Sequence, residues 1–321
     1  MEPSPITVVY IAGAGRSGST LLGNALGSIG SAFSTGELHM IWAALMNGSG
    51  CACGERVDRC PVWSRVLEHL ARARPQPIDP PALRALQREE SRVIQTGRVL
   101  RQLDRGDLRP GLVRYLDLLA ELYRAIAETV GTRVIVNSSK NSADAALLER
   151  VSGVDGRVIH LVRDPRAVAH SHARVRPTND PHRATTMHRE GAIESAARWA
   201  AVNHFARRIG SRPSARYTVV RYEDFVAAPR VTLERLAAFS GLDDADLPLT
   251  DDGKLVVRSG HTVWGNRNRF ASGGVALKAD DAWRTEGSRR TIWLSTAVTA
   301  PWLRTYGYPL RARGSATSPT S

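Results

Sequence analysis

The stretch Gly13-Ala14-Gly15-Arg16-Ser17-Gly18-Ser19-Thr20-Leu21-Leu22 directly follows a β-branched run, ITVVYIA, at residues 6–12. An apolar run that ends in a glycine-rich turn predicts a buried strand, and the spacing after the turn predicts a helix over residues 19–28. Backbone N–H groups and the helix dipole converge at such a turn, which is therefore suited to bind an anion. The residues expected to contact the anion are Gly15, Arg16, Ser17, Gly18, Ser19 and Thr20.

The turn differs from the phosphate-binding turn of nucleoside triphosphatases, GxxxxGK[ST], at one important position. Ser19 occupies the place of the lysine, and Arg16 supplies a positive charge from inside the turn. The sequence also offers no convincing strand-end aspartate for magnesium, because the next predicted strand ends in Asn137-Ser138-Ser139-Lys140. We therefore expect a phosphate-bearing ligand whose transferred group needs no metal.

Three further apolar runs predict strands: RVIVN at 133–137, RVIHLV at 157–162 and YTVVR at 217–221. Strands that alternate with helical stretches indicate an α/β fold, here a P-loop-like, mostly parallel sheet flanked by helices. We expect one domain over residues 1–310, with a helical insertion at about 60–130, and a disordered tail at 311–321. Apolar residues at helical spacing predict core positions in the insertion at Leu112, Tyr115, Leu116, Leu119, Leu122, Tyr123 and Ile126.

The composition narrows the partners and the location. The net charge of +13 indicates anionic partners. The arginines are dispersed and aromatic residues make up only 6%, which argues against a nucleic-acid-binding protein. No apolar run reaches the ~18–20 residues of a membrane span, and the run at 6–12 lacks the basic region of a secretion signal. We therefore expect a cytoplasmic protein without an integral membrane segment.

A second anion-binding pattern, LVRDPRAVAHSHAR at residues 161–174, follows the strand predicted at 157–162. Arg163 lies at the carboxyl end of that strand, and Ser171 follows eight residues later in the next helix. Ligands of open α/β sheets bind at the carboxyl edge of the strands, so Arg163 should face the same crevice as the opening turn. Two separate phosphate sites predict a ligand with two separate phosphates.

These two motifs resemble those of sulfotransferases that use 3′-phosphoadenosine 5′-phosphosulfate (PAPS), most closely the tyrosylprotein and carbohydrate branch and its bacterial relatives. The resemblance runs from about Val8 to Tyr308 and is weak through the insertion. It implies that residues 16–20 hold the 5′-phosphosulfate and that Arg163 and Ser171 hold the 3′-phosphate. It also implies a sulfuryl transfer to a hydroxyl, with adenosine 3′,5′-bisphosphate as the product.

The resemblance extends to several other segments. Glu37, in STGEL, matches the catalytic base of tyrosylprotein-type enzymes, and His39 is the rival base two residues away. Lys140, in NSSKN, matches a lysine near the transferring sulfuryl group, which Arg16 would stabilise as well. The stretch 261–270 resembles a loop that closes over the nucleotide, and Tyr222 lies in another recurrent segment. The nucleotide contacts expected from these two segments are Tyr222, Gly265, Asn266 and Arg269.

The implied reaction needs no metal, because a sulfate carries less charge than a γ-phosphate and protein cations can replace magnesium. The acceptor is expected to bear a hydroxyl, as in a sugar, a lipid headgroup, a natural product or a tyrosine, and a homodimer is compatible with the family. Two other interpretations stay open at this point. They are a kinase-like phosphotransferase on the same fold and a nucleotide-binding protein without catalysis.

The three cysteines, Cys51, Cys53 and Cys60, fall within ten residues, CACGERVDRC. Reduced, packed thiols are the favoured interpretation for a cytosolic chain, with a Cys53–Cys60 disulfide as a variant. A zinc site would need a fourth ligand, for which His69 is the candidate, and the CxC spacing differs from the usual CxxC knuckle.

Overall fold

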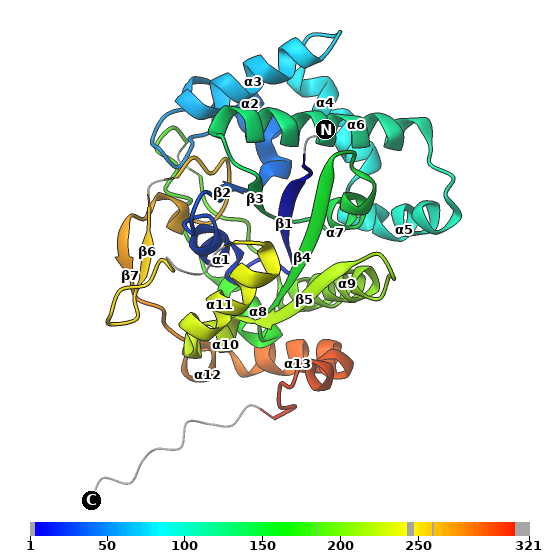
Figure 1. Cartoon of the computed structure of the whole chain (residues 1–321). Helices are drawn as coiled ribbons and strands as arrows, with labels where there is room; N and C mark the ends of the chain where they lie inside the picture. Colours follow the sequence, from blue (N-terminus) through cyan, green and yellow to red (C-terminus); the bar gives the residue numbers. More distant parts are fainter. Residues whose placement is uncertain (1–3, 184, 243–246, 259, 312–321) are drawn as a thin grey trace, which may run out of the picture.

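The computed structural model describes residues 4–183, 185–242, 247–258 and 260–311 (Figure 1). Within these ranges, five parallel strands form one sheet in the order β2-β3-β1-β4-β5, which confirms the predicted α/β fold, and two short antiparallel strands form a separate hairpin. The strands are β1 (Ile6–Ala12), β2 (Phe33–Gly36), β3 (Val134–Lys140), β4 (Val154–Val162), β5 (Arg216–Arg221), β6 (Leu255–Val257) and β7 (Gly273–Val275).

Helices cover both faces of this sheet. On one face α6 and α7 pack against β1 while α9 packs against β4 and β5; on the other, α1 packs against β2 and β3 while α10 packs against β5. No helix in the described ranges is long and apolar enough to cross a membrane. The α-helices are α1 (Ser19–Leu26), α2 (Ile41–Asn47), α3 (Pro61–Ala73), α4 (Pro80–Glu90), α5 (Thr96–Arg105), α6 (Pro110–Val130), α7 (Ser142–Leu147), α8 (Pro165–Ala173), α9 (Ala192–Gly210), α10 (Tyr222–Ala227), α11 (Pro229–Ser240), α12 (Ala282–Thr285) and α13 (Arg289–Thr305).

The central strand β1 explains why its sequence is continuously apolar. Side chains alternate between the two faces of a strand, and both faces of β1 are covered by helices. Val8 and Tyr10 enter the core beneath α6, whereas Val9 and Ile11 enter the core beneath α1. All four side chains are fully buried, so β1 fixes the position of the glycine-rich turn that follows it.

The predicted helical insertion forms α3, α4, α5 and α6. In Figure 1, α3, α4 and α6 lie at the top and α5 lies at the right, beside α7. Every apolar residue predicted to face the core from α6 is buried. The proline cluster at 75–81 spans the loop before α4 and the first two residues of that helix, whose N-cap is Asp79. Residues 312–321 of the predicted disordered tail lie outside the described residues.

The sequence did not predict strand β2 or the β6–β7 hairpin. The β2 sequence, FSTG, has four residues and no apolar alternation, so its extended form depends on parallel pairing with β3. A return segment, residues 261–266, then runs along the far side of β2. The N–H of Val263 donates to the carbonyl of Thr35 at 2.9 Å, and the N–H of Glu37 donates to that of Trp264 at 3.0 Å.

All three cysteines are free, and no Cys53–Cys60 disulfide is formed. His69 lies on α3 with Nδ1 3.6 Å from the Glu128 carboxylate, so the interpretation of His69 as a companion of the cysteines is wrong. His261 of the return segment lies beside them instead. Local sequence could not predict this neighbour, because the return segment meets the turn at residues 51–55, here called the cysteine turn, only after the chain has crossed the whole sheet.

The imidazole of His160, on β4, is fully buried. Nδ1 lies 2.6 Å from the hydroxyl of Tyr217, and Nε2 lies 2.7 Å from Oδ1 of Asn203. A neutral ring accepts at one nitrogen and donates at the other, which matches these two partners. Burial lowers the pKa of His160 to about 4.

This geometry predicts that the protein loses stability in mild acid. Because the folded pKa lies below the ~6.5 of an unfolded chain, the stability that neutral His160 contributes is present above pH 6.5 and is lost as the pH falls toward 4. We expect His160 alone to lower the free energy of unfolding by on the order of 2 kcal/mol between pH 7 and pH 5. Urea denaturation of wild type and His160→Gln measures this, and an equal pH dependence of the two would contradict it.

Candidate active site

The carboxyl ends of all five parallel strands lie at one edge of the sheet, where ligands of open α/β sheets bind. Five predicted site segments follow these strand ends. They are the turn at residues 13–20 after β1, Glu37 after β2, Lys140 at the end of β3, Arg163 after β4 and Tyr222 after β5. Strand direction therefore brings together residues from five separate parts of the sequence.

The glycine-rich turn is shaped for close approach. Gly18 is the N-cap of α1 with φ of 92°, a left-handed conformation that favours glycine. A Cβ atom there would lie 2.5 Å from Cδ2 of Tyr222, so only glycine allows this ring to pack against the turn. No side chain caps α1, which leaves its first N–H groups available to an anion.

A cavity of about 260 Å³, here called the turn cavity, lies over this turn. It contains most of the predicted site and four polar or sulfur-bearing residues that were not predicted, namely Arg176, Met187, Asn268 and Asp280. The predicted residues that line it are Gly15, Arg16, Gly18, Ser19, Thr20, Glu37, Lys140, Arg163, Ser171, Tyr222 and Asn266.

The unpredicted residues come from loops. Asn268 lies two residues beyond Asn266 in a stretch that the sequence already singled out, so it could have been found. Arg176 and Met187 belong to the polar loop 175–189, and Asp280 precedes α12. Nothing in local spacing distinguishes these three from other loop residues.

Arg163 is held in place on several sides. Its Nη1 donates to the carbonyl of Arg16 at 2.8 Å, and its Nη2 lies 3.1 Å from a carboxylate oxygen of Asp280. The guanidinium also lies over the ring of Tyr222, 4.7 Å from the centroid. These contacts fix the guanidinium in the lining of the turn cavity, to which Ser171 also belongs.

The turn cavity gathers more cations than anions. Burial, together with the nearby Arg176, lowers the pKa of Arg16. Burial acts to raise the pKa of Asp280, but the hydrogen bond from Arg163 and the surrounding guanidinium charges outweigh it, so this pKa is lowered. Asp280 is thus a carboxylate that partly neutralises a site otherwise suited to a multiply charged anion.

Glu37 and Lys140 form an ion pair at the centre of the site. Nζ of Lys140 lies 2.7 Å from Oε1 of Glu37 and donates to the carbonyl of Ser138 at 3.0 Å. Both side chains are largely shielded from solvent, with 15% and 17% exposure. A carboxylate held by one ammonium group keeps lone pairs that can accept a proton from a third partner.

Backbone strain is concentrated at the two predicted catalytic cations. Among the described residues, the only non-glycine residues with a positive φ are Arg16, Lys140 and Asn179. The angle φ is 64° at both Arg16 and Lys140. Such conformations typically cost 1–3 kcal/mol, on the order of a hydrogen bond or two, and persist where the surrounding structure enforces them. An observed strain at these two positions supports a functional role for both.

His39 lies beside the ion pair but is not among the residues that line the turn cavity. The backbone N–H of His39 donates to Oγ of Ser139, and its backbone carbonyl accepts from the guanidinium of Arg84. Burial lowers the pKa of His39 to about 4, with Lys140 and Arg84 acting in the same direction and Glu37 opposing them. The ring is therefore neutral at pH 7 and a weak base.

Three predicted nucleotide contacts lie outside the lining of the turn cavity. Ser17 is buried, and its hydroxyl has no hydrogen-bond partner among the described residues. A Cβ at Gly265 would lie 3.2 Å from the hydroxyl of Thr20, so this glycine packs on the turn from behind. The guanidinium of Arg269 donates to the carbonyl of Val263 at 2.6 Å and lies 3.4 Å from Asp180, which directs it into the protein.

A second, larger cavity of about 680 Å³, the side cavity, adjoins the first. The two cavities share three lining residues, Gly15, Glu37 and Lys140. The ion pair therefore lies where the two cavities meet, and each cavity has room for part of one reactant. His39, His172 and His188 line the side cavity and not the turn cavity.

Residues 8–246 match the family model described as the sulfotransferase family. This range covers β1 from Val8 onward, the other four strands of the parallel sheet, the glycine-rich turn and the Arg163 motif. The chain belongs to the sulfotransferase family. It is thus a sulfotransferase enzyme, and the family implies a PAPS-type donor and a hydroxyl-bearing acceptor. The return segment and α12 lie beyond the matched range.

The following solved structure shows the same fold, and a second one also matches. The sulfotransferase domain from the curacin biosynthetic pathway matches with 19% identity and a TM-score of 0.50, over 97% of this chain and 100% of that domain. The sulfotransferase domain of the Synechococcus PCC 7002 olefin synthase matches with 20% identity and a TM-score of 0.42, over 97% and 99%. A search of curated proteins gave no match.

Proposed function

We propose that this sulfotransferase moves the sulfuryl group of PAPS to a hydroxyl of an acidic acceptor, with Glu37 as the general base. One observation carries the proposal: the Glu37–Lys140 pair lies where the turn cavity meets the side cavity. The uncapped turn lines the turn cavity together with Arg163 and Ser171, which supports two contacts to anionic groups there. A donor with a 5′-phosphosulfate and a 3′-phosphate fits both at once.

The residues of the turn cavity suit this donor chemically. N–H groups of the turn and the Arg16 guanidinium would hold the 5′-phosphate, where negative charge grows as the donor bond breaks. Gly18 gives the backbone room for a close approach. Arg163 would hold the 3′-phosphate, which takes the place of the Asp280 carboxylate on the guanidinium.

The sulfuryl group moves from donor to acceptor in one in-line step. The acceptor oxygen forms a bond to sulfur, and the bond between sulfur and the 5′-phosphate oxygen breaks. The hydroxyl proton passes to Glu37, and adenosine 3′,5′-bisphosphate leaves with the electron pair of the broken bond. Lys140 and Arg16 stabilise the charge on the sulfuryl and phosphate oxygens in the loose transition state, by analogy with phosphoryl transfer.

The side cavity supports an acidic acceptor. Three arginines of its lining, Arg84, Arg88 and Arg92, come from α4 and the residues that follow it, and the described residues give them no carboxylate partner. Burial and the neighbouring Arg88 lower the pKa of Arg84, although Tyr115 and Asp144 act in the opposite direction. Arg198, by contrast, is paired with Glu190 at 3.2 Å. A carboxylate or phosphate on the acceptor would pair with these three arginines and neutralise their charge.

Matched acceptor pairs test this function. Purified protein is incubated with ³⁵S-labelled PAPS and one acceptor at a time. The matched pairs, acidic member first, are glucuronate with glucose and 4-hydroxybenzoate with phenol, and a cell extract is tested separately. Labelled products are identified by mass spectrometry. Sulfation that favours the acidic member of a pair supports the proposal. Preference for neutral acceptors would overturn the proposal that the acceptor is acidic, but not the proposal of sulfuryl transfer. Turnover of ATP with magnesium in place of PAPS would instead indicate a kinase-like phosphotransferase.

Replacing Arg163 by alanine is expected to weaken binding of adenosine 3′,5′-bisphosphate by about 10–100-fold, the usual worth of hydrogen bonds to a charged group. Binding of adenosine 5′-phosphate, which lacks the 3′-phosphate, should change little. Calorimetry with both nucleotides makes the comparison. Equal losses for the two would mean that Arg163 acts only by supporting Arg16 through its hydrogen bond.

A further inference from the structure

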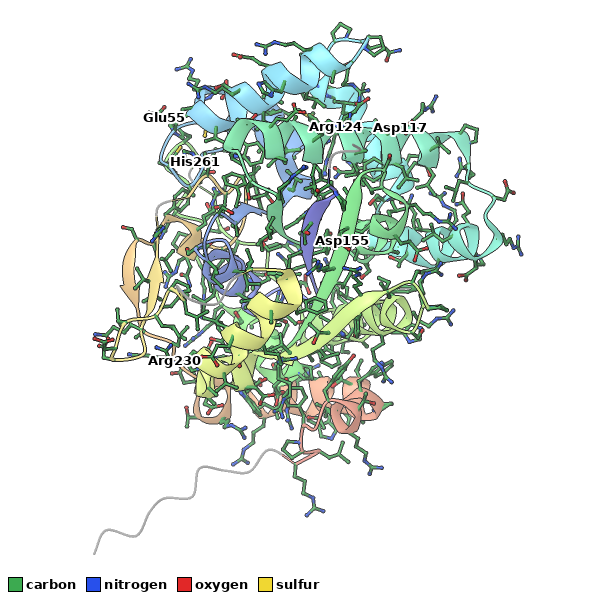
Figure 2. The ribbon with its side chains drawn as sticks, viewed as in Figure 1. Glu55, Asp117, Arg124, Asp155, Arg230 and His261 are labelled. Carbon is green, nitrogen blue, oxygen red and sulfur yellow. The ribbon has the colours of Figure 1, made fainter. Side chains whose placement is uncertain are left out.

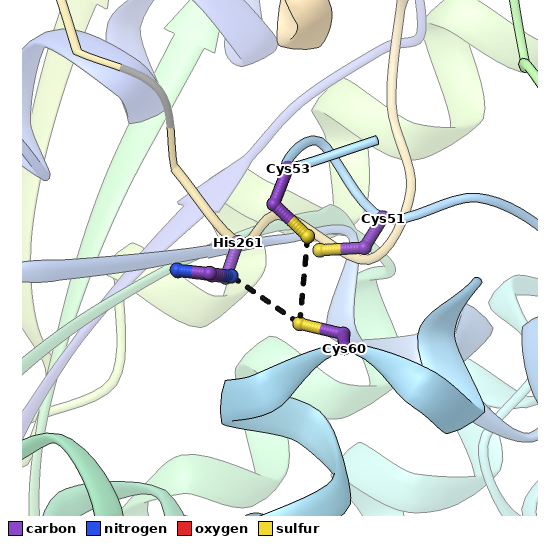
Figure 3. Close-up of side chains that lie close together, drawn as sticks. All are labelled: Cys51, Cys53, Cys60 and His261. Carbon is purple, nitrogen blue, oxygen red and sulfur yellow. Dashed lines mark hydrogen bonds between the residues drawn. The ribbon is translucent and has the colours of Figure 1, made fainter. Parts of the chain in front are cut away.

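The three cysteines and His261 form a compact cluster apart from both cavities, shown in Figure 3. Sγ of Cys60 lies 3.2 Å from Nδ1 of His261 and 3.7 Å from Sγ of Cys53. The four potential ligand atoms all lie within 4.8 Å of one another. Cys51 and Cys60 are fully buried, and Cys53 and His261 are partly buried.

These spacings match a tetrahedral zinc site. With Zn–S bonds of about 2.3 Å and Zn–N bonds of about 2.0–2.1 Å, a tetrahedron places two sulfurs ~3.8 Å apart and a sulfur and a nitrogen ~3.6 Å apart. The separations of Cys60 from Cys53 and from His261 are close to both values. A disulfide would instead need its two sulfurs at about 2.05 Å.

The backbone holds these side chains together. The N–H of Gly54 donates to the carbonyl of Cys51 at 3.0 Å, and the N–H of Cys51 donates to that of Glu55 at 2.7 Å. Gly54, with φ of 95°, closes this tight turn. The indole N–H of Trp63 donates to the carbonyl of His261, and Figure 2 shows His261 close to the turn that carries Glu55.

We propose that Cys51, Cys53, Cys60 and His261 bind one zinc ion. Four protein ligands leave no open position, so the site is structural and takes no part in the transfer chemistry. The CxC spacing is not an obstacle, because the fourth ligand comes from the return segment, over two hundred residues away. Zinc would replace the thiol protons and bind three thiolates and a neutral imidazole.

The ion would fasten the return segment beside the catalytic pair. The N–H of Ala52 donates to the carbonyl of Thr262 at 3.1 Å, so the cysteine turn and the return segment are already joined. Two residues further on, Trp264 accepts from the N–H of Glu37 at 3.0 Å, and Asn266 reaches the hydroxyl of Thr20. Zinc at one end of this segment would thus limit the motion of residues that line the turn cavity.

Metal content tests the proposal without any assay of activity. Untagged protein, purified under reducing conditions, is analysed by inductively coupled plasma mass spectrometry. We expect about one zinc per chain in wild type and less than about 0.1 in Cys53→Ser and His261→Ala, because a structural site needs all four ligands. His69→Ala is the matched control and should keep its zinc, since His69 contacts Glu128 instead.

Thiol labelling of the wild type decides the question even if the variants fold poorly. The three thiols should resist Ellman's reagent until a chelator removes the metal, and the melting temperature should fall at the same time. Wild type that contains no zinc, and takes up none when the reduced chain receives one equivalent, would overturn the proposal. So would a mass two daltons lower than that of the reduced chain, which indicates a disulfide.

Discussion

Replacing Glu37 by glutamine is expected to lower kcat by about 10²–10⁴-fold, the usual contribution of a well-placed general base. Glutamine keeps the shape of the side chain and an oxygen that can still accept from Lys140, but it cannot take the proton of the acceptor hydroxyl. The carboxylate of Glu37 faces the junction of the two cavities. Steady-state kinetics with PAPS and the best acceptor of the panel above measures the change.

Two controls separate loss of the base from loss of the site. Binding of adenosine 3′,5′-bisphosphate by Glu37→Gln should stay within about twofold of wild type, because Glu37 makes no bond to the nucleotide in the proposed arrangement. His39→Gln should cost less in kcat, since the pKa of His39 is about 4 and its ring lies outside the turn cavity. The reverse order of the two variants would assign the base to His39.

Replacing Lys140 by methionine is expected to lower kcat by about 10²–10³-fold, comparable to removing one donor that stabilises transition-state charge. Methionine has nearly the same length and carries no charge, and Lys140 is the cation that pairs with Glu37 among the described residues. Lys140→Arg retains a charge and should lose less than Lys140→Met. Single-turnover measurements with saturating PAPS isolate the transfer step from product release.

The two largest effects are not expected to add. Lys140 and Glu37 are in contact at 2.7 Å, and residues in one ion pair act as a unit. The double variant Glu37→Gln, Lys140→Met should therefore be less than tenfold slower than the slower single variant, on the order of the residual effect seen when coupled groups are removed together. Full multiplication of the two losses would show that the residues act independently.

The site motifs that could be predicted from sequence are local ones. The opening turn is defined within ten residues by β-branched residues, glycines and hydroxyls, and Arg163 is defined by its place directly after an apolar strand. The core stripe of α6 repeats every three to four residues, so burial of its members followed from spacing. Strand β2 has no such pattern, because its extended form comes from pairing with β3.

The sequence by itself determined four of the five parallel strands, the glycine-rich turn after β1 and the core stripe of α6, because each depends on neighbours a few residues apart. Only the tertiary structure decided that Asp280 holds Arg163, that Arg269 turns inward to Asp180, and that His261 rather than His69 joins the cysteines. It also decided that Glu37 and Lys140 stand between two cavities. These contacts join loop segments that can lie more than two hundred residues apart in the sequence. The packing of the whole chain brings these loops together, and no local spacing encodes that packing.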